Sequence, residues 1–320
     1  MIPTRLPSPS SRICAPDRLF PLDATARAIA RRLHQAVAHL PIVSPHGHTD
    51  PRWYAENEAF PDPARLFVVP DHYVFRMLYS QGVAMEDLGV PARDGTPVET
   101  DPRAIWRRFA THYHLFRGTP TRLWLDHAFA ALFGLDERLS AANADRVYDL
   151  MDGALRQPPY RPRALFETFG IEAIATTEGA LDDLKWHAQI AVSGWTGRVV
   201  TTYRPDAVVD PDFEGFRGNL ARLGELTGED TATWAGYLAA HRRRRAFFKA
   251  HGATASDHGH PSARTADLSP ADAERLFHVV AAGRPMPEEA DLFRGQMLTE
   301  MARMSLDDGL VLQIHPGSRR

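Results

Sequence analysis

The chain has 320 residues, enough for one large domain or two modest ones, and its 44% hydrophobic and 24% charged residues are ordinary for a globular protein. Its formal net charge of −3 gives no electrostatic reason to expect a nucleic acid or an anionic membrane surface as a partner. Cys14 is the only cysteine, which excludes an intrachain disulfide, and no apolar run resembles a secretion signal or a membrane span, so we expect a soluble cytoplasmic protein.

The first 48 residues show three successive patterns. Residues 1–22 are rich in proline and have no clear period, which predicts an extended segment. Residues 23–40 carry apolar side chains at helical spacing, and the apolar run at 41–44 predicts a buried strand. That strand ends in His46 and His48, whose side chains lie two positions apart and would therefore share one face. Such a pair is half of a metal site, although two ordinary loop histidines give the same pattern.

Residues 49–163 contain little that resembles a strand. Aromatic side chains, among them Trp106, Phe109 and Tyr113, recur at helical spacing, which favours contacts between packed helices. We interpret this stretch as a helical insertion.

Strand and helix patterns alternate in the remainder of the chain. Apolar runs at 171–177, 198–203, 253–257 and 310–315 predict strands, and helical patterns separate them. This alternation is typical of a parallel α/β fold. With the strand at 41–44 there are five predicted strands, whereas a closed (β/α)₈ TIM barrel has eight. The sequence therefore predicts a partial barrel formed by residues 23–48 and 164–320, with an open doubly wound sheet as the alternative.

Polar residues follow each predicted strand, and in a parallel barrel these strand ends meet at one rim. Each group alone fits a turn or a helix cap, but their succession is harder to assign to turns. The groups, with further short segments between them, are Pro45-His46-Gly47-His48, Asp71-His72-Tyr73, Gly118-Thr119-Pro120, Thr176-Thr177, Arg204-Pro205-Asp206, Ser256-Asp257-His258-Gly259 and His315-Pro316-Gly317-Ser318-Arg319-Arg320.

This set of segments is similar to the uronate isomerase (glucuronate isomerase) family of the amidohydrolase superfamily, in family order from about residue 20 to the last residue. Family members continue through three more βα units, and the last of their strands carries an aspartate metal ligand. The resemblance therefore implies a C-terminally truncated chain whose activity is impaired. Glu178 stands where the family usually has aspartate.

The resemblance implies an enzyme that interconverts D-glucuronate with D-fructuronate and D-galacturonate with D-tagaturonate. It also implies one divalent metal ion, most plausibly zinc, held by His46 and His48, with the third ligand absent from this chain. We therefore expect weak zinc binding. Lys185 and Lys249 are the only lysines and fall in helical patterns, which argues against a lysine-bridged metal pair.

Tyr73, with His72 and Asp71 beside it, is the candidate for proton transfer. A tyrosine has an ordinary pKa near 10, so it would need a neighbouring cation to act as a base at neutral pH. Arg204 and Arg320 are candidates for binding the sugar carboxylate, and surface ion pairs are the alternative. His315 is a candidate for a hydroxyl contact, and His258 for either substrate contact or a structural role at its strand end.

Three functional hypotheses remain open from the residues. The chain could be a uronate isomerase, a metal-dependent hydrolase of the amidohydrolase type, or a non-catalytic remnant that binds a partner through open sheet edges. The four arginines at 242–245 fall in a helical pattern and predict a solvated helix face rather than nucleic-acid binding. A homo-oligomer is compatible with the sequence.

Overall fold

The computed structural model describes residues 13–317, so most of the predicted segment 1–22, as well as Arg320, lies outside the described residues. By its internal contacts the chain divides into two units, each described by itself below. Unit 1 comprises Met1–Ile42 and Asn57–Ile171, and unit 2 comprises Val43–Glu56 and Glu172–Arg320.

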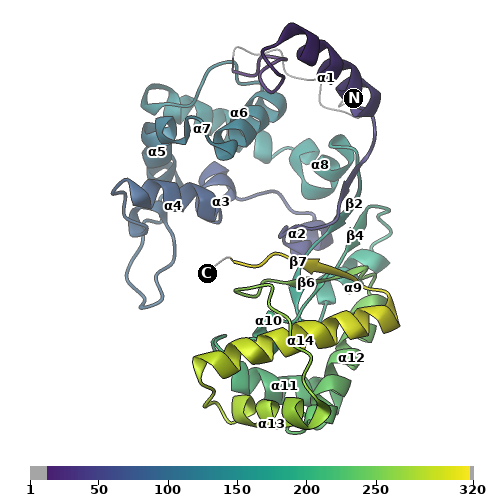
Figure 1. Ribbon diagram of the computed structural model, residues 1–320. Coiled ribbons are helices and arrows are strands. Elements are labelled where there is room, and N and C mark those ends of the chain that lie inside the picture. The colour runs from purple at the N-terminus through teal and green to yellow at the C-terminus, as the bar shows by residue number, and fades with distance from the viewer. Residues whose placement is uncertain (1–12, 318–320) are drawn as a thin grey trace. The chain divides into compact units, whose positions relative to one another are not determined.

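Unit 1 is helical, as the sequence predicts for most of its length (Figure 1). Several of its helices begin with a proline that directly follows an aspartate or threonine. The side chains of Asp62, Asp101 and Thr119 accept hydrogen bonds from the first turn, and proline suits that turn because it needs no donor there. The helices are α1 (Ala24–Val37), α3 (Pro63–Phe67), α4 (His72–Ser80), α5 (Pro102–His112), α6 (Pro120–Phe133), α7 (Ala144–Leu155) and α8 (Pro162–Thr168), with short 3₁₀ helices η1 (Glu86–Leu88), η2 (Tyr113–Phe116), η3 (Ala141–Asn143) and η4 (Pro158–Tyr160).

The core of unit 1 is built from aromatic side chains. Trp106, Phe109 and Tyr113 lie on one side of α5 and its continuation, and all three are fully buried. Phe109 packs edge-on against Tyr113 with ring centroids 5.4 Å apart. The predicted helix contacts in this stretch are therefore confirmed.

Unit 2 combines helices with parallel strands, which confirms the predicted α/β class. Its helices α11, α13 and α14 lie together on one side of β6 and β7 (Figure 1). The strands are β1 (Ile42–Ser44), which begins at the last residue of unit 1's first segment, β2 (Ile171–Ala175), β3 (Glu178–Gly179), β4 (Arg198–Val200), β5 (Tyr203–Arg204), β6 (Ala255–His258) and β7 (Val311–Ile314). The helices are α2 (Pro51–Glu56), α9 (Lys185–Val192), α10 (Asp206–Val209), α11 (Phe216–Thr227), α12 (Trp234–Ala250), α13 (Pro270–Ala281) and α14 (Pro287–Asp308).

The strands form two sheets, in the orders β1-β2-β4 and β3-β5-β6-β7. The described residues therefore contain seven strands, where the sequence predicts five. A pair of threonines separates β2 from β3 (residues 176–177), and another separates β4 from β5 (residues 201–202). Hydrogen bonds continue across the interruption, from the amide of Thr176 to the carbonyl of Val200 and from the amide of Glu178 to the carbonyl of Thr202. The side chain of Thr177 instead donates to the backbone carbonyl of Gly47 at 2.8 Å, a bond of the kind that competes with regular strand pairing.

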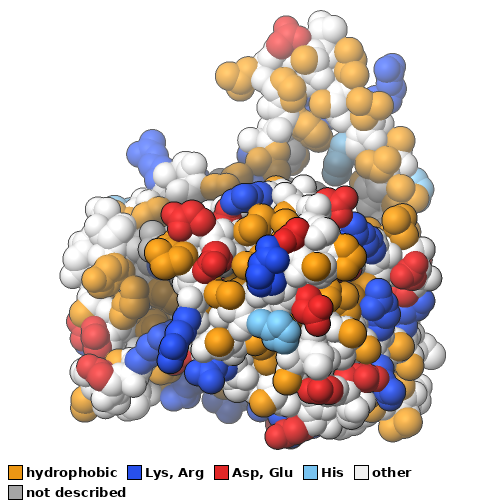
Figure 2. All heavy atoms as spheres, turned by 60° about the horizontal axis from the view of Figure 1, so that its bottom comes forward, with side chains coloured by type: hydrophobic (Ala, Val, Ile, Leu, Met, Phe, Trp, Pro, Cys, Tyr) orange, Lys and Arg blue, Asp and Glu red, His pale blue; other side chains and the backbone are white. Residues whose placement is uncertain are grey.

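The arginines of α12 correct one prediction. Arg242 and Arg243 are exposed, whereas Arg244 and Arg245 are buried and therefore do not belong to a solvated face. The guanidinium of Arg245 donates to both carboxylate oxygens of Asp308. The part of unit 2 that faces the viewer in Figure 2 carries acidic and basic side chains intermingled with apolar ones. None of the helices within residues 13–317 is long and apolar enough to cross a membrane.

Replacement of a core aromatic should destabilise unit 1. For Phe109→Ala we expect a loss of about 3–5 kcal/mol in the free energy of unfolding, because the ring is fully buried among other aromatics. Leu33→Ala is the control, since Leu33 is 62% exposed and its loss should cost less than about 0.5 kcal/mol. Urea denaturation followed by circular dichroism measures both, and equal effects of the two changes would contradict the assigned core.

Candidate active site

Residues near the carboxyl ends of three neighbouring strands form one row across the larger sheet. Asp257 of β6 lies opposite Gln313 of β7. One residue earlier, Tyr203 of β5 lies opposite Ser256, which places Arg204 beside Asp257. Residues of one row project from the same face of a sheet. The strand register therefore brings a guanidinium, a carboxylate and a carboxamide together.

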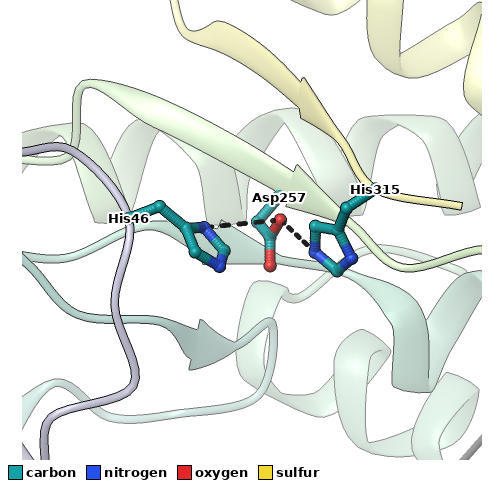
Figure 3. A group of neighbouring side chains, drawn as sticks. All are labelled: His46, Asp257 and His315. Carbon is teal, nitrogen blue, oxygen red and sulfur yellow. Dashed lines mark ion pairs between the residues drawn. The ribbon is translucent and has the colours of Figure 1, made fainter. Parts of the chain in front are cut away.

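Asp257 lies in the middle of this row and is fully buried. Its Oδ1 lies 2.6 Å from Nε2 of His315 and 3.8 Å from Nδ1 of His46 (Figure 3). Its Oδ2 lies 3.2 Å from Nη1 of Arg204. The carboxylate therefore has two imidazoles on one side and a guanidinium on the other. Within residues 13–317, His46, Asp257 and His315 form a group of possible metal ligands whose donor atoms all lie within 4.8 Å of one another.

The segment that carries His46 is held against β7 by the side chain of Gln313. Its Nε2 donates to the carbonyl of Pro45 at 2.9 Å, and its Oε1 lies 3.0 Å from Nδ1 of His46. Because that amide oxygen can only accept, this contact requires a proton on Nδ1 of His46. Gly47 allows the segment that carries His46 to lie close to β2, because a Cβ at position 47 would lie 3.1 Å from the carbonyl oxygen of Ala175.

Arg204 is fixed by a second carboxylate. Its Nε donates to Oδ2 of Asp206 at 2.7 Å, and the amide of Gly259 donates to Oδ1 of the same side chain at 3.2 Å. A Cβ at Gly259 would collide with Nη2 of Arg204 and lie 3.2 Å from Cε1 of His315. A residue without a side chain at position 259 therefore leaves space for Arg204 and His315 in these positions.

A cavity of about 300 Å³ lies at β3 and is lined by His48, Glu178 and His187, among others. Thr201 donates a hydrogen bond to Oε2 of Glu178, yet burial raises the pKa of this carboxyl to about 7. Nε2 of His187 lies 3.7 Å from the same oxygen, and burial lowers the pKa of His187 to about 4. The cavity therefore contains a carboxyl group that can hold or release a proton near neutral pH.

The structure places the predicted metal ligands His46 and His48 next to each other, with ring centroids 5.0 Å apart. His315 and Arg204 both contact Asp257, as described above. His258 is fully buried, with Nε2 3.1 Å from Oγ of Ser256, and burial lowers its pKa well below the usual value.

The three residues predicted for proton transfer belong to unit 1. The carboxylate of Asp71 accepts hydrogen bonds from the amides of Tyr73 and Val74 and so caps α4. His72 and Tyr73 begin that helix with ring centroids 4.2 Å apart, and Tyr73 is 59% exposed.

Three residues of the site were not among the predicted ones, namely Asp257, Gln313 and Glu178. Asp257 and Glu178 each stand in a polar group at the end of a predicted strand, which was the available signal. Gln313 likewise stands among the polar residues at the end of the last predicted strand, but its role depends on a partner far away in the sequence.

Comparison with known proteins gives one consistent result. The sequence profile of the family described as glucuronate isomerase matches residues 21–320. A uronate isomerase of Mesorhizobium japonicum is 68% identical over 305 residues, which are 95% of this chain and 65% of the relative, and one of Rhizobium meliloti is 66% identical over the same shares. The chain thus spans 65% of the length of these curated relatives.

Two solved structures agree with this result. The crystal structure of glucuronate isomerase from Caulobacter crescentus is 55% identical with a TM-score of 0.92, over 95% of this chain and 64% of that one. Uronate isomerase from Thermotoga maritima is 27% identical with a TM-score of 0.82, over 90% of this chain and 62% of that one.

Glu178→Gln should change how stability depends on pH. The raised pKa of Glu178 stabilises the fold fully below its ordinary value of 4.5, and this contribution is lost as the pH rises through about 7. Glutamine at position 178 has no ionisable group, so the variant does not lose this stability as the pH rises. The difference in unfolding free energy, variant minus original chain, should therefore increase by on the order of 2–3 kcal/mol between a pH of about 5 and a pH of about 8. His187 is present in both proteins, and its contribution cancels in the difference.

Urea denaturation at the two pH values measures this difference. Glu225→Gln is the control, because Glu225 is an exposed glutamate whose removal should leave the pH dependence unchanged. A difference between Glu178→Gln and the original chain that stays constant with pH would contradict the raised pKa.

Proposed function

The chain belongs to the glucuronate isomerase family, and we propose that it interconverts D-glucuronate with D-fructuronate, and D-galacturonate with D-tagaturonate, at the strand ends of unit 2. The observation that carries this proposal is the convergence of Arg204, His46 and His315 on the buried Asp257. These groups offer what an anionic sugar needs, namely a guanidinium for its carboxylate and imidazoles for its oxygen atoms.

The reaction moves two protons, one between carbon atoms and one between oxygen atoms. A proton leaves C2 of the open-chain aldose and the aldehyde oxygen is protonated, which gives an enediol. A proton is then delivered to C1 while the C2 hydroxyl loses its own proton and becomes the ketone. This C–H group is a weak acid, so the site must place a base beside it and stabilise the oxygen that gains negative charge. We propose Tyr73, with His72 beside it, for the proton transfer, and Asp71 as the cap that fixes their helix.

Arg204 is proposed to bind the carboxylate of the uronate. Its Nε and Nη1 face Asp206 and Asp257, and neither of these two contacts involves Nη2. A guanidinium held in this way loses little conformational freedom when it binds a substrate. It can offer its remaining N–H donors to the planar carboxylate of the sugar. His315 and His258 are proposed to contact or support sugar hydroxyl groups, and Arg320 remains a proposed second cation.

The residues present fit the divalent metal ion that the family resemblance implies. Neither oxygen of Asp257 has a hydrogen-bond partner among the described residues, nor has Nε2 of His315, although all three atoms are buried. His46 would hold the ion, either with His48 as predicted or with Asp257 and His315. When bound, the ion would polarise a sugar oxygen as a Lewis acid.

We further propose that the two sheets of unit 2 are parts of an incomplete eight-stranded barrel. Because β3 follows β2 and β5 follows β4 along the chain, the two sheet orders combine into one succession of neighbouring strands. The same order suits a parallel barrel with its site at the carboxyl ends. A cytoplasmic location and a homo-oligomeric state belong to the proposal.

The proposed activity is tested by incubating the purified chain with D-glucuronate and following ketose formation by proton NMR. The Caulobacter crescentus enzyme serves as the reference, and hydrolysis of a dipeptide and a lactone is measured in parallel. We expect D-fructuronate to form without hydrolysis of either compound. Hydrolysis without ketose would favour a metal-dependent hydrolase, and no reaction at all would favour a non-catalytic remnant.

Arg204→Lys should lower kcat/KM for D-glucuronate by roughly 10- to 100-fold, which corresponds to the loss of about 1.5–3 kcal/mol from a charged hydrogen bond. Lysine keeps the charge but cannot reach two carboxylates and the substrate together. Arg243→Lys is the matched control, because Arg243 is exposed and pairs with Glu229. Equal rates for the two variants would remove Arg204 from the proposed site.

A further inference from the structure

Two carboxylates from different elements face the guanidinium of Arg204, and their contacts differ. Asp257 in β6 forms an ion pair with Nη1, yet neither of its oxygens has a hydrogen-bond partner within residues 13–317. Asp206, the first residue of α10, instead accepts a hydrogen bond at each oxygen. Hydrogen bonds fix direction as well as distance, so Asp206 is the group that can set the orientation of the guanidinium.

The backbone returns Asp206 to Arg204 through a short turn. Pro205 lies between them with a φ of −86° and a ψ of 0°, so β5 ends and α10 begins within two residues. Oδ2 of Asp206 lies 2.7 Å from Nε of Arg204, and each of the two side chains is only 15% exposed. Because proline restricts φ and the partners are close in the sequence, forming this contact costs little chain entropy.

The second oxygen of Asp206 contacts the neighbouring strand end. Its Oδ1 accepts a hydrogen bond from the amide of Gly259 at 3.2 Å, and Gly259 directly follows β6. One carboxylate therefore binds a side chain at the end of β5 and the backbone at the end of β6, the strand that carries Asp257. In this way Asp206 sets where the guanidinium lies relative to the next strand end.

The space around this pair is small on the β6 side. A Cβ at position 259 would collide with Nη2 of Arg204 and would lie 2.9 Å from Oδ2 of Asp206. Gly259 is not among the glycines with positive φ, so alanine can adopt its backbone conformation. Gly259→Ala would therefore displace the pair without backbone strain, which gives a second and independent way to disturb it.

We propose that Asp206 is a positioning residue, which fixes the guanidinium of Arg204 in the orientation that receives the carboxylate of the uronate. This inference rests on the proposed function, because Arg204 is there the group that binds this carboxylate. The sign of the effect separates orientation from charge. A negative charge beside Arg204 weakens its attraction for an anionic sugar, so removing the charge alone would tighten binding. Loss of a fixed orientation weakens binding instead.

The first test measures KM and kcat for D-glucuronate in the original chain, Asp206→Asn and Asp206→Ala. Asparagine keeps the size of the side chain but accepts through one oxygen only, so one of the two donors loses its acceptor, and alanine leaves both without one. KM should rise roughly 10-fold in Asp206→Asn and roughly 100-fold in Asp206→Ala, the range for hydrogen bonds to charged groups. The value of kcat should change by less than about threefold, because the sugar carboxylate does not react.

The second test does not require activity. The Nε–H group of Arg204 gives a signal in a proton–nitrogen NMR spectrum, and its disappearance in Arg204→Lys identifies it. Exchange of this proton with water should be at least about tenfold faster in Asp206→Ala than in the original chain, because the hydrogen bond that slows exchange is lost. Glu225→Gln is the matched control, since it removes an exposed carboxylate paired with Arg222 and should change neither KM nor this exchange.

A lower KM in Asp206→Ala would overturn the proposal in favour of an effect of charge alone, and so would unchanged exchange at Arg204. A fall in kcat without a rise in KM would also contradict it. Should circular dichroism show that Asp206→Ala is unfolded, Gly259→Ala should give the same rise in KM. If the original chain forms no ketose, the isomerase activity fails, whereas the exchange measurement still decides whether Asp206 fixes Arg204.

Discussion

The site of unit 2 depends on how one buried carboxylate is neutralised. Asp257 is fully enclosed, and an enclosed carboxylate is stable only beside compensating charge or hydrogen bonds. Arg204 supplies charge on one side and is itself shared with Asp206. The imidazoles of His46 and His315 occupy the other side. Arg204 and His315 lie beside Asp257 because the parallel register sets β5, β6 and β7 at matching heights, whereas His46 follows β1 and is held by Gln313.

Much of this arrangement could be predicted from the sequence, for a physical reason. Strand periodicity and the polar residues that follow each strand are local signals, and parallel strands bring their carboxyl ends to one edge. The same signals underlie the family assignment, which is confirmed. The five-strand count is not confirmed, because two of the predicted strands are divided at the threonine pairs 176–177 and 201–202. Threonine has good strand propensity, but its hydroxyl can also bond outside the regular strand pairing, as that of Thr177 does with Gly47.

The partners across long sequence separations could not be predicted. Arg244 and Arg245 lie in a run of arginines that suggests an exposed face. In the structure, however, Arg245 donates a hydrogen bond to Asp308, and Arg244 donates one to the carbonyl of Ala180. From the sequence alone, Asp257 is equally compatible with a turn. Only the folded structure places His315, at the end of β7, beside it. Helical or strand periodicity reports which residues share a face, not which charge from another element will lie opposite.

Two carboxyl groups at these strand ends have different surroundings, and this difference bears on the chemistry. Glu178 on β3 faces Thr201 and His187, and burial raises its pKa to about 7. Asp257 on β6 faces a guanidinium and two imidazoles. β5 lies between these two strands in the sheet. Some active sites need one carboxyl group that exchanges protons and a second that faces positive charge. In such sites the two carboxyl groups commonly have different surroundings, as here. The same parallel sheet can therefore supply both roles from neighbouring strand ends, since only the partners of each carboxyl group differ.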